Sequence, residues 1–333
     1  MKKALIALSV AAGMIGAAQA ENTTTLYGSL GYSTSIDKSR NESISGSVKE
    51  NRWDLDTATA KFGIKGTEDL AGGVQAFYKM EFGFDVNGGV DNTRYAYLGL
   101  KGDFGTVTLG KQNSLFKTVT NYNDIFNDVF YSDELATFSS ATGGSRLPKA
   151  ISYVSPNFGG FQFGIAGVLD GSNQVIKNSA SKDFDAAQAG IWYDQNGFYA
   201  GLAYSWIDAD DNQTRGVNSK GKIVAFNPGT TEVVGGAIGY SNDQFKVGLG
   251  AQHQASYGEV YNLAGEYYFG PNTVRGGFSL ADPKGDDNVY VYALGYQYNF
   301  SKRTYTWVEG EYRDFKGKES DGYTVKVGLR HDF

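Results

Sequence analysis

The chain ends on YTVKVGLRHDF (Tyr323–Phe333), a stretch that alternates between apolar and polar residues up to its last position. One parity holds Tyr323, Val325, Val327, Leu329, His331 and Phe333, and the other holds Thr324, Lys326, Gly328, Arg330 and Asp332. A period of two is the pattern of a strand with one apolar and one polar face. Because an unpaired edge strand exposes backbone hydrogen-bonding groups, a strand that runs to the terminus requires a partner on both sides.

The first twenty residues, MKKALIALSVAAGMIGAAQA, have the pattern of a secretory signal peptide. Two lysines precede a short apolar run, and Ala18-Gln19-Ala20 supplies the small residues of a cleavage site. We therefore expect residues 1–20 to be removed on export, so that residues 21–333 form the folded protein.

The composition is unusual for a soluble exported domain. The 333 residues include no cysteine, 45 glycines and only 5 prolines, and 14% of them are aromatic. No segment beyond residue 20 has the roughly 18 apolar residues that a transmembrane helix requires. A chain that is polar on average, aromatic-rich and exported fits a membrane β-barrel, whose strands alternate lipid-facing and water-facing residues. An aromatic core of a soluble β-sandwich is the alternative reading.

Seven short turn signals separate the alternating runs. They are Thr67–Gly73, Lys101–Gly105, Ser155–Gly160, Asp194–Gly197, Ser241–Gln244, Gly270–Asn272 and Asn299–Arg303. The turns divide residues 21–333 into eight pieces, and each piece is long enough for one hairpin. We therefore predict an all-β fold, a 16-stranded antiparallel transmembrane β-barrel. Closure of the barrel predicts pairing of Leu26–Ser33 with Tyr323–Phe333.

Aromatic residues gather at the turn ends of the predicted strands. They are Phe104, Phe158, Phe161, Phe198, Tyr199, Tyr240, Phe245, Tyr267, Tyr268, Phe269, Tyr298 and Phe300. Because aromatic rings favour the boundary between lipid and water, we interpret them as an outward-facing girdle.

The third piece, Lys101–Val154, is longer than two strands and a loop require. Its central segment has an apolar face and four carboxylates, Asp124, Asp128, Asp133 and Glu134. Long loops with their own apolar face are usually functional. We expect this third loop to fold inward and narrow the lumen, the alternative being an outer loop that covers the barrel.

Six blocks, in order, carry a family resemblance. They are TLYG, KFGIKGTEDLAGGVQAFYKMEFGF, RYAYLGLKGDFGTVTLGKQNS, RLPKAISYVSPNFGGF, YQYNFSKRTYTWVEG and VGLRHDF. The chain resembles the trimeric, sixteen-stranded general diffusion porins of Gram-negative outer membranes. The tail and FSKRT are most similar to the neisserial branch.

The resemblance implies a pore constriction in which the acidic third loop faces a ladder of bases on the barrel wall. The bases that match the family pattern are Lys61, Arg94 and Arg146. By parity, Lys65, Lys79 and Glu81 are expected to face inward as well, and the residues expected to face outward are Phe62, Ile64, Tyr95, Tyr97, Ile151 and Tyr153. The resemblance further implies a homotrimer in contact with outer-membrane lipid and lipopolysaccharide. It also implies that the outer-membrane assembly machinery recognises Phe333 as a signal.

We therefore expect a passive, water-filled channel for ions and small hydrophilic solutes in the cell outer membrane. A substrate-selective channel or a surface adhesin on the same barrel is the alternative. We predict no enzyme activity, cofactor, metal site or nucleic-acid partner, because no nucleophile with a base, ligand cluster or basic block stands out. The net charge of −6, which becomes −8 without Lys2 and Lys3, favours cations, whereas the basic ladder favours anions, so the sequence supports either ion preference.

Overall fold

The computed structural model describes residues 22–39, 52–85, 89–129, 146–169, 184, 186–207, 214–217, 223–226, 231–255, 257–285, 287–315 and 322–333. The predicted signal peptide lies outside these residues, as do Asp133 and Glu134.

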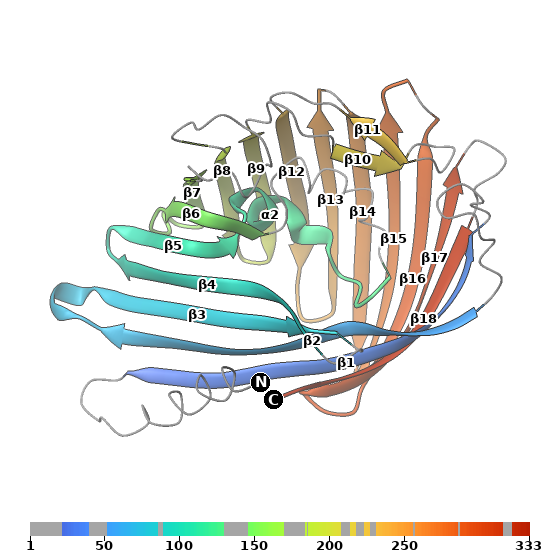
Figure 1. Ribbon diagram of the computed structural model, residues 1–333, viewed down its shortest axis with the longest axis horizontal. Coiled ribbons are helices and arrows are strands. Elements are labelled where there is room, and N and C mark those ends of the chain that lie inside the picture. The colour runs from blue at the N-terminus through green and yellow to red at the C-terminus, as the bar shows by residue number, and fades with distance from the viewer. Residues whose placement is uncertain are drawn as a thin grey trace.

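Sixteen strands of the described chain close into one antiparallel barrel (Figure 1). They are β1 (Thr23–Ser39), β2 (Arg52–Asp69), β3 (Gln75–Phe84), β4 (Val90–Gly102), β5 (Gly105–Asn113), β6 (Arg146–Val154), β7 (Phe161–Val168), β8 (Ala186–Gln195), β9 (Phe198–Ile207), β12 (Thr231–Ser241), β13 (Phe245–Gln254), β14 (Gly258–Phe269), β15 (Asn272–Pro283), β16 (Val289–Asn299), β17 (Thr304–Phe315) and β18 (Gly322–Asp332). The predicted fold class is confirmed.

The remaining described elements are short. Strands β10 (Thr214–Val217) and β11 (Ile223–Phe226) form a separate two-stranded sheet. Helix α2 (Leu115–Thr120) and the 3₁₀ turn η2 (Asn121–Asn123) follow β5 and lie within the barrel in Figure 1, and the 3₁₀ turn η1 (Ala71–Gly73) joins β2 to β3. No helix in the described part of the chain is long and apolar enough to cross a membrane.

All seven predicted turns connect neighbouring strands of the barrel. The turn between β8 and β9 shows why its residues suit the position. Asn196 and Gly197 have φ angles of 54° and 81°. A two-residue hairpin turn with both central residues at positive φ matches the twist of the flanking strands and favours Asn-Gly.

The terminal strands β1 and β18 close the barrel. Their ladder runs from Ser29 paired with Asp332 to Ser39 paired with Gly322. Gly28 and Phe333 then exchange two backbone hydrogen bonds of 3.0 Å. The prediction that the last strand pairs with the first is correct. The predicted range Leu26–Ser33 begins before the range that pairs, Ser29–Ser39, because the strands of a closed barrel are staggered.

The two faces of the wall differ in chemistry. On β1, the side chains of Ser29 and Ser33 face inward and are buried, whereas Leu26 and Leu30 are exposed on the outside. Most predicted girdle residues are likewise exposed, among them Phe104, Phe158, Phe161, Phe198, Tyr240, Tyr267, Phe269, Tyr298 and Phe300. Tyr199 does not belong to the girdle, because it follows an outward residue and faces inward. Tyr268, which lies between the outward-facing Tyr267 and Phe269, also faces inward and does not belong to the girdle.

Candidate functional site

The basic residues predicted for the pore, here called the basic wall, come from β2, β3, β4 and β6. They are Lys61, Lys65, Lys79, Arg94 and Arg146. Lys65 pairs with Lys79 across β2 and β3, and Lys61 pairs with the buried Ser29 of β1. Because directly paired residues of antiparallel strands project to the same face, the three lysines lie on the inner side of the barrel.

Glu81 of β3 lies in the middle of the basic wall, and its side chain is only 1% exposed. The Nε atom of Arg94 donates a hydrogen bond of 2.6 Å to its carboxylate, and the Tyr27 hydroxyl donates another of 2.8 Å. The Nζ atom of Lys79 lies 3.5 Å from the same carboxylate. One buried acid is therefore surrounded by several bases and fixes the position of at least two of them.

A β-bulge in β4 determines which aromatic residues face the lumen. The pairing of β3 with β4 shifts by one residue after Glu81, and Arg94 is the extra residue. A bulge breaks the alternation of faces, so Arg94 and its neighbour Tyr95 both project inward. Tyr97 pairs with Lys79 and also faces inward. The prediction that Tyr95 and Tyr97 face outward was wrong, because a strict period of two does not continue through a bulge.

Arg146 of β6 lies beside the lysines through its contact with Tyr95. Its guanidinium carbon is 5.0 Å from the centroid of the Tyr95 ring, and Lys79 Nζ is 3.9 Å from that centroid. The Tyr95 hydroxyl donates a hydrogen bond of 2.7 Å to Asn113, which pairs with Arg146 in the sheet. Cations near a ring face are attracted by the ring quadrupole, so Tyr95 helps to hold both bases on the wall.

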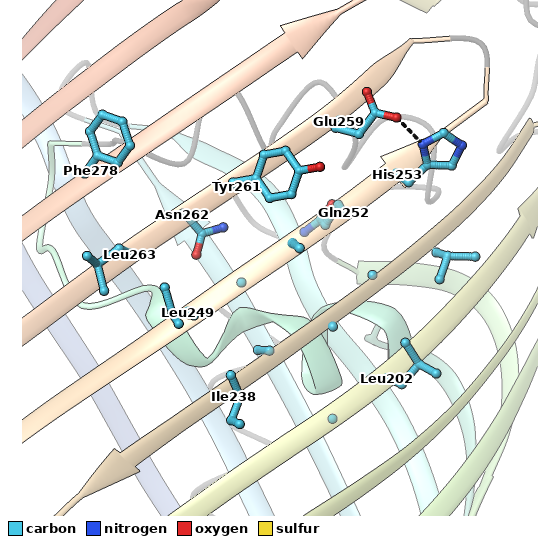
Figure 2. A pocket seen from close by; sticks show the side chains of 17 residues that line it. Leu202, Ile238, Leu249, Gln252, His253, Glu259, Tyr261, Asn262, Leu263 and Phe278 are labelled. Carbon is cyan, nitrogen blue, oxygen red and sulfur yellow. Dashed lines mark hydrogen bonds and ion pairs between the residues drawn. The ribbon is translucent and has the colours of Figure 1, made fainter.

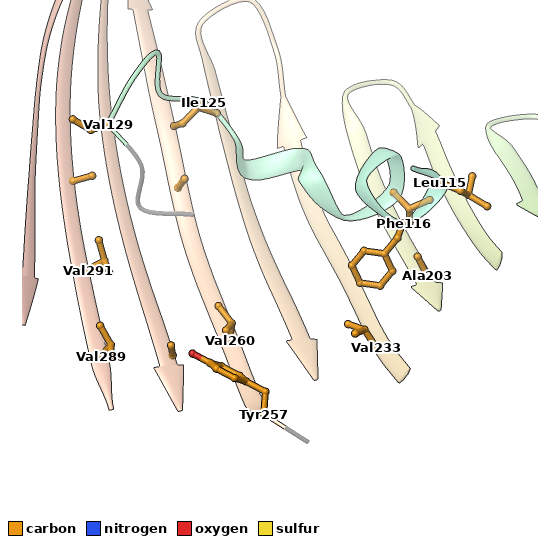
Figure 3. Packing of buried hydrophobic residues seen from close by; sticks show 14 of the residues in the cluster. Leu115, Phe116, Ile125, Val129, Ala203, Val233, Tyr257, Val260, Val289 and Val291 are labelled. Carbon is orange, nitrogen blue, oxygen red and sulfur yellow. The ribbon is translucent and has the colours of Figure 1, made fainter. Parts of the chain in front are cut away.

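Residues 115–129, here called the pore segment, lie along the inside of the barrel, from β8, β9 and β12 at α2 to β17, β18 and β1 at Asp128. Ser114 caps α2 by accepting a hydrogen bond of 2.9 Å from the Lys117 backbone N–H. The apolar side of α2 contributes Leu115, Phe116 and Val119 to a buried cluster with inward residues of β9 and β12 (Figure 3). The apolar face predicted for this segment therefore packs on the barrel rather than on solvent.

Glu309 of β17 binds the end of the pore segment. Its fully buried carboxylate accepts hydrogen bonds from the backbone N–H groups of Asn127, Asp128 and Val129, at 2.9 to 3.1 Å. Arg275 of β15 lies 3.4 Å from the same carboxylate. Successive N–H groups that converge on one carboxylate form a strong anchor, because each bond is charge-assisted.

The two described acids of the pore segment occupy different environments. Asp124 is exposed and accepts a hydrogen bond of 2.8 Å from the Asn121 side chain. Asp128 forms an ion pair of 3.1 Å with Lys326 of β18 and also accepts a hydrogen bond from Ser33 of β1. Asp128 is thus fixed at the junction of the first and last strands, and Asp124 is the described carboxylate that remains exposed.

Further charged residues of the lumen were not among the predicted site residues. They are Glu309, Arg275, Lys326 and Arg330. The polar parity of the C-terminal strand contains both Lys326 and Arg330, so this signal was present in the sequence. Glu309 and Arg275 carried no comparable signal. Glu309 binds the backbone of a segment about 180 residues away in the chain, and Arg275 contacts Glu309.

A depression on the outside of the barrel is separate from this charged lumen. Figure 2 shows it over β12, β13 and β14, with the exposed Leu202, Ile238 and Leu249 along it. His253 and Glu259 meet at one end through a contact of 2.7 Å. Its lining is mostly apolar, as expected for a surface that faces lipid or another subunit. Within the described chain, no group of three or more His, Cys, Asp or Glu residues is arranged to hold a metal.

A closed barrel with an apolar outside, an aromatic girdle and a charged lumen defines a membrane channel of the bacterial outer-membrane type. The chain belongs to the Gram-negative porin family, which it matches over residues 4–320. It is an outer-membrane protein and a passive, water-filled diffusion channel.

Individual relatives agree with this assignment. The major outer membrane protein P.IB of Neisseria gonorrhoeae is 31% identical over 369 residues, with both chains fully covered. The anion-selective porin from Comamonas acidovorans has the same fold, with a TM-score of 0.73, 24% identity, and coverage of 94% of this chain and 100% of that one. OmpT of Vibrio cholerae, in its trimer form, has a TM-score of 0.71, 14% identity, and coverage of 94% and 99%. The expected similarity to neisserial proteins is confirmed.

Proposed function

We propose that this porin is a general diffusion channel that prefers anions and has its constriction between the basic wall and the pore segment. The observation that carries the proposal is the local excess of positive charge. Arg94 and Lys79 contact one buried acid, Glu81, and neither Lys61 nor Lys65 forms an ion pair within the described residues. Asp128 on the facing segment is already paired with Lys326.

The position of these charges matters more than the negative net charge of the chain. Salt screens exposed charges beyond about 8 Å at physiological ionic strength, so charges farther away than this act weakly on an ion inside the lumen. Charges that line a narrow section set the selectivity of a channel. A relative of the same fold is described as an anion-selective porin, which supports the same preference here.

The test is the reversal potential of the purified channel in a planar bilayer with a potassium chloride gradient. We expect a sign that corresponds to chloride preference. The double variant Lys61→Gln, Lys65→Gln should shift the reversal potential toward potassium, because it removes two charges and keeps Arg94 and Lys79, the two bases that contact Glu81. Lys302→Gln, in the turn between β16 and β17, is the matched control. Potassium preference in the unmodified channel would overturn the proposal.

The remaining features of the protein follow from the family. We infer cleavage of residues 1–20, a homotrimer, contact with lipid and lipopolysaccharide, recognition of Phe333 by the assembly machinery, and no enzymatic activity. A structural relative described in a trimer form supports the homotrimer. A native mass of one chain in mild detergent would contradict it.

A further inference from the structure

Three inward side chains form a row across neighbouring strands of the basic wall. Lys65 of β2 pairs with Lys79 of β3, and Lys79 pairs with Tyr97 of β4. Neighbouring strands are about 4.8 Å apart, so the three side chains leave the wall next to one another. The Nζ atom of Lys79 lies 3.9 Å from the centroid of the Tyr95 ring, which in turn contacts the Tyr97 ring. The row continues to Gly110 of β5, which adds no side chain next to Tyr97.

The aromatic end of this row belongs to a larger group of rings. Tyr97 is in edge-to-face contact with Tyr95, at 6.1 Å and 87°, and with Phe77, at 6.1 Å and 72°. Perpendicular neighbours at such distances are the favoured geometry of aromatic packing, and a further ring can extend it. The structure thus places aromatic surface and positive charge side by side in the lumen.

Two neutral hydrogen-bonding groups near this row are engaged by other residues of the protein. The Tyr27 hydroxyl donates to Glu81, and the Tyr95 hydroxyl donates to Asn113. A sugar would require several hydroxyl-binding groups, whereas the row offers charge and ring surface. Lys65, which is exposed and has no ion pair within the described residues, supplies the charge. This combination complements a carboxylate attached to a flat ring.

We propose that Lys65, Lys79 and Tyr97 form a binding site for small aromatic carboxylates that pass through the channel. The carboxylate lies at the two lysines, and the ring packs against Tyr97 beside Tyr95 and Phe77. This inference rests on the proposed anion preference and specifies which class of anion the channel binds most strongly. Binding in a channel must be weak enough for release, and an exposed Lys65, a Lys79 that is shared with Glu81 and one ring contact meet this condition.

The experiment measures block of the chloride current by benzoate, cyclohexanecarboxylate and acetate in planar bilayers. Cyclohexanecarboxylate matches benzoate in size and charge but lacks the aromatic face. We expect benzoate to halve the current at a concentration about twofold to tenfold lower than cyclohexanecarboxylate, the range that an aromatic contact provides. Acetate should be weakest.

Two variants locate the effect. Tyr97→Leu should remove most of the advantage of benzoate over cyclohexanecarboxylate. Tyr305→Leu is the matched control, since Tyr305 also faces inward near a cation, 5.6 Å from the Arg330 guanidinium, but lies on β17. It should keep the advantage. Each variant is assessed only after it forms channels of stable conductance.

Equal block by benzoate and cyclohexanecarboxylate in the unmodified channel would overturn the site. An advantage that persists in Tyr97→Leu, or disappears in Tyr305→Leu, would also overturn it. The reversal potential in potassium chloride is recorded on the same channels. Chloride preference without benzoate discrimination therefore rejects the aromatic site alone, whereas potassium preference rejects the proposed function.

Discussion

At the scale of single residues, Glu81 determines how much positive charge the basic wall presents to the lumen. Its buried carboxylate binds Arg94 at 2.6 Å and lies 3.5 Å from Lys79. We expect Glu81→Gln to raise the chloride-to-potassium permeability ratio by about twofold to fivefold, because a unit charge a few ångströms away in water contributes about 1 kcal/mol. The measurement is the reversal potential, with Glu68→Gln at the end of β2 as control. An unchanged ratio would contradict this role of Glu81.

For some side chains of this wall the sequence predicted the correct face, and for others it did not. The family pattern indicated the inner face for Lys61, and parity indicated it for Lys65 and Lys79. Parity holds here because β2 and β3 pair without a break over these positions. Parity failed for Tyr95 and Tyr97, because one extra residue in β4 moves both rings into the lumen. A bulge depends on the pairing partner as much as on local composition, so the sequence of β4 gave no sign of it.

At the scale of elements, the carboxylate of Glu309 anchors the end of the pore segment. Glu309 accepts hydrogen bonds from three successive backbone N–H groups, those of residues 127, 128 and 129. We expect Glu309→Ala to cost about 3–5 kcal/mol in local stability, since Arg275 and the N–H groups lose a buried partner. Single-channel recordings should then show larger current fluctuations. Glu311→Ala, an inward acid on the same strand, is the control, and quiet currents in Glu309→Ala would contradict this anchor.

The same element illustrates a limit of composition-based reasoning. Length, apolar pattern and acidity correctly marked residues 115–129 as unusual, and the apolar residues do pack on the wall. Composition could not distinguish the two described acids from each other. Asp128 is paired with Lys326, about 200 residues away in the chain, whereas Asp124 is exposed. Such pairing follows from the closed barrel, which brings β18 beside β1.

At the scale of the whole molecule, the alternation of residues and the turn signals were sufficient to predict the barrel. Each of the seven turns is local, and period-two patterns report the two faces of a wall directly. The closure register was less predictable, because it depends on the stagger of all sixteen strands rather than on any one of them.

The last residue, Phe333, belongs to this closure, since its backbone forms two hydrogen bonds with Gly28. We expect deletion of Phe333 to reduce the level of the protein in the outer membrane several-fold. Refolding of the purified, denatured chain into detergent should change little, because the deletion removes two hydrogen bonds, each worth about 1 kcal/mol. Phe300→Ala, an exposed ring in the turn after β16, is the control. Equal losses of folded protein in cells and in detergent would show that Phe333 stabilises the closure between β1 and β18 and is not a signal for assembly.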